Sequence, residues 1–296
     1  MSTQQDTGRH PGQKPKAERA DHENVLVYRR LRYFKIALGL CAAAVAAYLW
    51  HTPLGGRANG GTWLGYTLGG VGAALILWLT WFGIRKRRYG RVRWMLEDWL
   101  SGHVYLGLSL VLITLLHAGF QVGWNVHTAA FALMVLVIAS GLYGLYAALR
   151  YPPMVSDNRQ GMTVDQLLER IVDLGDEAER MAVEMDDAIN DAVQQARRQP
   201  AVATSLIGQL RGRPKACRMA AARELVERTA AESGASGEQT GRLLTVLVRI
   251  EDLLARLRLD MRLRARMRVW RFLHVPLTIA LFPALAAHVL AVFFYW

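Results

Sequence analysis

Long apolar runs without charge alternate with short basic segments over most of the chain, and one charged stretch interrupts this pattern. A helix that crosses a bilayer needs about 20 mostly apolar residues. The stretch Trp99–Leu149 contains no Asp, Glu, Lys or Arg, but it is too long for one helix, and the turn-forming residues Gly119–Asn125 divide it. The apolar runs predict five membrane-spanning helices, near residues 34–52, 62–84, 97–121, 127–149 and 268–295.

The pattern changes after the fourth predicted span. We expect Arg150–Pro153 to end that helix, because proline disfavours a helix interior. The following residues, 151–263, are charged, rich in Ala and Leu and almost free of aromatic side chains. Apolar residues recur there at the spacing of amphipathic helices. Thr163 and Gln166 precede one such run in the pattern of a capping box.

This charged segment predicts a helical domain rather than a nucleotide-binding one. Breaks near residues 199–200, 212–214 and 234–237 divide it into three or four helices, and we expect the last helix to continue into the fifth span. It contains no histidine, no glycine-rich phosphate loop and no strand alternation, so a nucleotide or flavin site is not expected in it. A role in docking or assembly is the remaining interpretation.

The expected fold is therefore all-α: a five-span transmembrane helical bundle with a cytoplasmic helical insert between spans four and five. Residues 1–30 form a polar tail that we expect to be disordered, since it offers little apolar surface to bury. Residues 31–150 contain spans one to four, residues 151–263 form the cytoplasmic domain, and residues 264–296 contain span five.

The net charge of +12 could indicate nucleic-acid binding, but the positions of the basic residues favour a membrane topology. They cluster at residues 29–35, 85–93 and 262–271, whereas the opposite connections carry only Arg57 or no cation. Cytoplasmic loops are enriched in Lys and Arg. We therefore expect a multi-pass protein of a bacterial inner membrane, with a cytoplasmic N-terminus and a periplasmic C-terminus. Anionic lipid, and not nucleic acid, is the expected partner of these cations.

Two cysteines, Cys41 and Cys217, are too few for a disulfide framework or a thiolate cluster. The segment before the first span is too long and too mixed for a secretory signal, so we expect this span to be retained. Cleavage near Ala46 or Ala47 is the alternative.

Of the eight histidines, the four nearest the interior of predicted spans form two pairs with the same spacing. The interval from His103 to His117 on span three equals the interval from His274 to His288 on span five. On an α-helix, this interval brings the second histidine to within about 40° of the first around the axis, and about 21 Å further along it. Spans three and five both run from cytoplasm to periplasm, so parallel helices would place His103 opposite His274 and His117 opposite His288.

Two stacked bis-histidine sites predict two b-type haems, because low-spin haem iron of this type takes two axial imidazoles. The cytoplasmic haem would be held by His103 and His274, and the outer haem by His117 and His288. Histidine within a membrane is costly and usually functional. A scaffold or transporter with satisfied polar residues explains each histidine alone but not the repeated spacing. A metal site or proton relay usually recruits carboxylates, and we expect none within the spans.

Other residues near the pairs have two interpretations each. Gly107 lies one turn past His103, where a missing side chain would admit the porphyrin. Arg93, Arg268 and Arg271 could pair with propionates of the cytoplasmic haem, or could serve only as topology signals.

The glycines of spans two and four, the prolines of span five and the histidines at span ends also have more than one interpretation each. The glycines of span two favour close helix packing without a site, and Gly141 and Gly144 could admit a porphyrin edge or another helix. Prolines 276 and 283 could kink span five. His51 and His127 could bind a propionate or a quinone, or could simply be solvated.

The motifs His103-Val-Tyr-Leu-Gly107 through His117 and Trp270-Arg-Phe-Leu-His274 through His288 resemble the ferric reductase-like and b561-like dihaem cytochromes b. The resemblance implies axial ligation by these four histidines and electron transfer across the membrane. Ferric reductases commonly have six spans and often a flavin and nicotinamide module. Because this sequence has five predicted spans and the helical insert instead, the electron donor would be another protein or a membrane quinol.

The expected function is that of a membrane dihaem b-type cytochrome, the electron-transferring subunit of a membrane oxidoreductase complex. It would move electrons between a redox partner or quinol and a carrier on the other side. Its partners would be iron-sulfur, flavin or cytochrome c proteins, and the sequence assigns no catalytic residue. The alternatives are a quinone-reactive oxidoreductase subunit and a non-haem scaffold or transporter.

Overall fold

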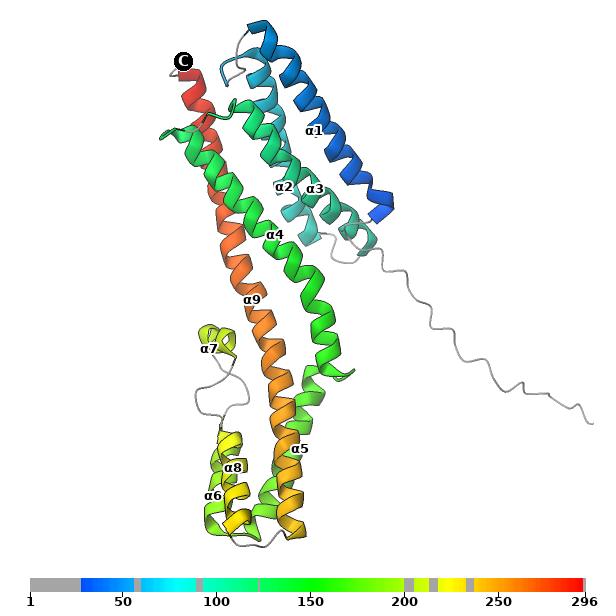
Figure 1. The fold of residues 1–296 in the computed structure, drawn as a ribbon, viewed down its shortest axis with the longest axis vertical. Helices are drawn as coiled ribbons and strands as arrows, with labels where there is room; N and C mark the ends of the chain where they lie inside the picture. The colour runs from blue at the N-terminus through cyan, green and yellow to red at the C-terminus, as the bar shows by residue number, and fades with distance from the viewer. Residues whose placement is uncertain are drawn as a thin grey trace, which may run out of the picture. The chain divides into compact units, whose positions relative to one another are not determined.

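The computed structural model describes residues 28–55, 60–88, 93–121, 123–199, 205–212, 218–232 and 237–294 (Figure 1). These residues form helices and connecting turns, with no strand among them. The helices are α1 (Tyr28–Gly55), α2 (Trp63–Arg88), α3 (Arg93–His117), α4 (Val126–Arg159), α5 (Val164–Val183), α6 (Asp187–Arg197), α7 (Leu206–Arg211), α8 (Arg218–Glu232) and α9 (Glu238–Phe294).

Five of the helices, α1, α2, α3, α4 and α9, are long and apolar enough to cross a membrane. Many large apolar side chains on them are exposed, including Leu77 on α2 and Ile279 and Phe293 on α9. An apolar surface of this extent is unfavourable in water. The described part of the chain is therefore all-helical, and its five long apolar helices are those expected of a multi-pass membrane protein, as the apolar runs predicted.

The chain divides into two compact units, one ending at Gly123 and the other beginning at Trp124. The fourth span consequently belongs with the charged insert and the fifth span. Residues 1–27, which include most of the tail expected to be disordered, lie outside the described residues.

In the first unit, α3 packs against both α1 and α2. Contacts between Trp78 and Trp99 and between Gly72 and Leu110 show that α2 and α3 run in opposite directions. The core at one end of this unit is apolar and includes Leu68 on α2 and Ile113 on α3. These contacts fix the side of α3 that α2 covers.

Helix α3 ends at His117, four residues earlier than the predicted end at residue 121. The amide of Gly119 donates to the carbonyl of Leu116 at 3.1 Å, and the amide of Phe120 donates to that of Leu115 at 3.2 Å. This pair of bonds is a Schellman motif, which needs a left-handed residue after the helix. Gly119, with φ +58°, supplies that conformation.

In the second unit, α4 and α9 pack side by side in opposite directions (Figure 1). The expectation that Arg150–Pro153 ends the helix is wrong, because α4 continues through Pro152 and Pro153 to Arg159. Packing against α9 opposes the cost of the two prolines. Tyr151 is buried with Leu263 of α9, and Arg159 forms an ion pair with the buried Asp260 of α9.

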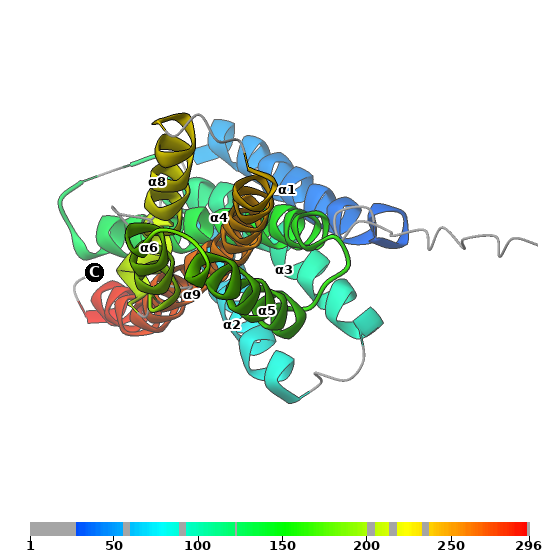
Figure 2. The same cartoon turned by 90° about the horizontal axis from the view of Figure 1, so that it is seen from below.

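Helices α5 and α8 pack against the first half of α9, and α6 packs against α5 and α8 (Figure 2). The predicted capping box begins α5, with Thr163 and Gln166 bonded reciprocally. The described part of the insert contains more helices than the three or four predicted. One additional break falls between α5 and α6, where the side chain of Asp186 accepts a hydrogen bond from the amide of Ala188.

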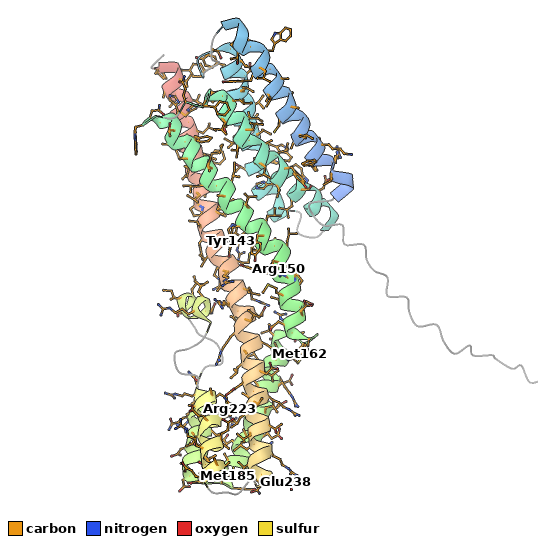
Figure 3. All side chains as sticks on the ribbon, viewed as in Figure 1. Tyr143, Arg150, Met162, Met185, Arg223 and Glu238 are labelled. Carbon is orange, nitrogen blue, oxygen red and sulfur yellow. The ribbon has the colours of Figure 1, made fainter. Side chains whose placement is uncertain are left out.

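Helix α9 begins at Glu238 and continues to Phe294, so the last helix of the insert does become the fifth span. Its first half buries apolar residues at helical spacing, among them Leu243, Leu247 and Ile250. Met185, just after α5, and Glu238 mark one end of this unit (Figure 3). Helix α9 thus belongs to both the charged helical domain and the apolar hairpin formed with α4.

Candidate functional site

The four histidines of the predicted haem sites lie on two helices, one in each unit. His103 and His117 are on α3, and His274 and His288 are on α9. All four side chains are partly buried. Each pair therefore has its own set of neighbours, supplied by the unit to which it belongs.

His117 is held by the first part of α2. Its Nδ1 lies 2.7 Å from the carbonyl oxygen of Gly65. A carbonyl oxygen can only accept a hydrogen bond, so Nδ1 must carry the hydrogen. In a neutral imidazole of that tautomer, the lone pair of the ring is on Nε2.

Two of the glycines of α2 make room for this histidine and its helix. A Cβ atom on Gly69 would lie 2.8 Å from Cε1 of His117, too close to be accommodated without movement of the ring. Gly72 faces Leu110 and Thr114 of α3, whereas nothing lies within 4 Å of a Cβ on Gly70. The sequence predicted close helix packing for these glycines, and α3 does pack closely on Gly69.

His274 is held by α4. Its Nδ1 lies 2.8 Å from Oγ of Ser140, and that Oγ also lies 2.7 Å from the carbonyl oxygen of Val137. A hydroxyl has one hydrogen. Because the carbonyl can only accept, Ser140 donates to Val137, and its oxygen accepts from Nδ1–H of His274. The lone pair of this ring is therefore also on Nε2.

Trp270, one turn before His274, completes this arrangement. Its indole stacks on the imidazole with ring centroids 5.3 Å apart, and its Nε1 donates to the carbonyl of Ser140 at 2.7 Å. A Cβ on Gly144 would collide with the Trp270 ring, and one on Gly141 would lie 3.5 Å from Cε1 of His274. The sequence allowed these two glycines to admit either a porphyrin edge or another helix. In the structure, side chains of α9 fill the space beside both.

His288 contacts a histidine to which the sequence assigned no definite role. The Nδ1 atoms of His127 on α4 and His288 on α9 lie 2.6 Å apart, and the rings are nearly perpendicular, at 88°. The signal in the sequence was the antiparallel pairing of spans four and five, which brings the start of one beside the end of the other. That pairing places His127, at the start of span four, close to His288.

The predicted accessory residues have simpler surroundings. A Cβ on Gly107 would make ordinary contact with Leu79 of α2, at 3.9 Å. Arg268 and Arg271 are exposed on α9. Arg93 is the first residue of α3, and its side chain lies outside the described part of the structure.

The expectation that the spans contain no carboxylate is wrong at the start of the third span. That span, as the structure describes it, begins at Asp98. The hydroxyl of Tyr33 on α1 donates to Oδ2 of Asp98 at 3.2 Å. A partner from a neighbouring helix stabilises the carboxylate at this position.

Among the described residues, no group of three or more His, Cys, Asp or Glu side chains is placed to hold a metal ion. Comparison of the chain with protein-family models, with curated proteins and with solved structures finds no match.

Proposed function

We propose that this chain is a membrane dihaem b-type cytochrome, the electron-transferring subunit of an oxidoreductase complex. His103 and His274 would be the axial ligands of one haem, near the cytoplasm. His117 and His288 would be those of the other, near the periplasm. The identical spacing of the histidines on both helices supports this pairing, because it separates the two sites by about 21 Å on each axis.

The observation that carries the proposal is the tautomer of two of these histidines. A metal-ligating histidine usually donates its other ring N–H to a carbonyl or a similar acceptor, which orients the ring and raises its basicity. His117 and His274 both direct Nδ1–H to an acceptor on the neighbouring helix, Gly65 and Ser140 respectively. A packed histidine also needs an acceptor for its ring N–H, so this shared arrangement supports haem ligation together with the repeated spacing of the four histidines.

The donor chemistry of these residues therefore fits haem iron. When bound, each haem supplies a one-electron couple, and the protein supplies position, electrostatics and burial. Arg93, Arg268 and Arg271 would neutralise the propionates of the cytoplasmic haem, whereas Gly107 faces Leu79 of α2. The stack of Trp270 on His274 would hold that imidazole in one orientation.

The basic clusters favour a bacterial inner membrane with the N-terminus and the helical insert in the cytoplasm. Electrons would then pass between an iron-sulfur or flavin protein, or a membrane quinol, and a carrier such as a cytochrome c protein on the other side. The insert offers a cytoplasmic surface for the soluble partner.

The decisive experiment is a pyridine haemochrome assay on the purified full-length chain in detergent. We expect about two haems b for each chain, since four imidazoles supply two axial pairs. His117→Ala and His274→Ala should each remove one haem and spare much of the other. His51→Ala, which changes a span-end histidine outside both pairs, should retain both.

A colourless protein would contradict the proposal and favour a scaffold or transporter. Haem retained in full by both His117→Ala and His274→Ala would contradict the ligand assignment. If quinol analogues shift the spectrum or potential of the bound haems, the quinone-reactive alternative is favoured.

A further inference from the structure

The contact between His127 and His288 joins two helices at one end of the α4–α9 hairpin. Only one hydrogen fits between two nitrogens 2.6 Å apart, so one Nδ1 donates and the other accepts. His127 lies in the first turn of α4, which Asn125 begins by accepting a hydrogen bond from the amide of Thr128 at 2.9 Å. The cap fixes where the helix starts and hence the level of His127.

The same two helices make an equivalent contact further along. On α4, His127 and Ser140 are separated by almost the same length of helix as their partners on α9, His288 and His274. Antiparallel helices with nearly equal separations meet side chain to side chain at both levels. Helix α4 therefore provides a polar atom to Nδ1 of both α9 histidines.

We propose that His127 is a positioning residue for the outer haem, a role that rests on the proposed function. Nδ1 of His127 accepts the Nδ1–H of His288, which fixes the tautomer of His288 with its lone pair on Nε2. His127 is thus the hydrogen-bond acceptor for Nδ1–H of His288, as Ser140 is for His274 and Gly65 is for His117. The acceptor orients His288 and makes it a more basic ligand.

The test compares His127→Leu with His127→Asn in the full-length protein. Leu removes the acceptor at similar volume, whereas Oδ1 of Asn can replace Nδ1 of His. The readouts are haem content, the midpoint potential of each haem from a redox titration of the α-band, and the low-spin ferric signals in electron paramagnetic resonance. The outer haem is the one lost in His288→Ala.

In His127→Leu we expect the reduction equilibrium of the outer haem to shift about tenfold toward the ferrous form, about 59 mV for one electron. A less basic imidazole stabilises ferric iron less, which is the reason for this direction. His127→Asn should restore the potential and the ferric signal. Ser140→Ala should shift only the other haem, and His51→Leu should shift neither.

Three results would overturn the inference, and the first two of them leave the dihaem proposal and its ligand assignment intact. The first is a wild-type potential at the outer haem in His127→Leu. The second is an equal change in His127→Leu and His127→Asn, which would mean that the acceptor atom is not what His288 requires. The third is loss of the haem in both His127 variants with retention in His288→Ala, which would make His127 the ligand. A wild-type protein without haem would instead contradict the proposed function itself.

Discussion

At the scale of single residues, glycines decide how closely the histidines approach the neighbouring helices. Gly69 and Gly70 are adjacent on α2, yet only the first faces a histidine, His117. On the α4–α9 hairpin, Gly144 faces Trp270, the residue that stacks on His274, and the indole occupies the space where a Cβ of Gly144 would be. The absence of a side chain is thus a specific requirement at some positions and incidental at others.

We expect Gly69→Ala to destabilise the protein and Gly70→Ala not to. A methyl group on Gly69 would push the His117 ring from its place, and overpacking of this kind costs about 1–3 kcal/mol. Gly70→Ala adds a methyl group with nothing within 4 Å and should be neutral or slightly stabilising. Thermal unfolding in detergent and haem content measure both. Equal effects of the two substitutions would contradict the role of Gly69.

At the scale of elements, α4 and α9 are joined by a polar contact where the apolar part of the hairpin ends. The carboxylate of Asp260 is fully buried, and its Oδ2 lies 2.7 Å from Nη2 of Arg159 and 3.2 Å from Nε of Arg264. The side-chain amide of Asn158 donates to the carbonyl of Arg256 at 2.9 Å. These bonds hold the last turns of α4 on α9, beyond the two prolines.

Arg159→Ala should destabilise the α4–α9 hairpin by about 3 kcal/mol, because it leaves a buried carboxylate with one fewer partner. Arg242→Ala is the matched control. Arg242 forms an ion pair with Glu238 on the same helix, but both side chains are mostly exposed, so its loss should cost less than about 1 kcal/mol. Chemical unfolding followed by circular dichroism compares them. Similar losses in the two variants would show that Asp260 does not depend on Arg159.

At the scale of the whole molecule, the basic clusters predict which parts of the chain face the cytoplasm. Glu238 begins α9 at one end of the second unit (Figure 3), and its side chain is 80% exposed. Trp124 precedes α4, and it is fully exposed. If α4 and the second half of α9 cross the membrane, these two positions lie on opposite sides of it.

We therefore expect opposite labelling of two single-cysteine variants. In a background with Cys41→Ser and Cys217→Ser, Glu238→Cys should react with an impermeant maleimide only in inverted inner-membrane vesicles. Trp124→Cys should react only from the periplasmic side of intact spheroplasts. The reverse pattern would invert the topology and with it the assignment of the cytoplasmic and outer haems.

The sequence by itself determined the elements whose cause is local. Apolar runs located the five long helices, because hydrophobicity over about 20 residues is enough to specify a span. The capping box at Thr163 could also be predicted from the sequence, because its two partners are close together in the chain. The two histidine pairs could be recognised in the sequence by their equal spacing. The spacing did not identify the atoms that accept hydrogen bonds from each ring.

Only the tertiary structure decided which residues surround the histidines within each unit. Gly65, Ser140 and His127 are far from their partners in the chain, and the register of antiparallel helices brings them together. The passage of α4 through its prolines likewise depended on burial against α9 and on the ion pair with Asp260. Local propensity predicted a stop there, and contacts between distant segments outweighed it.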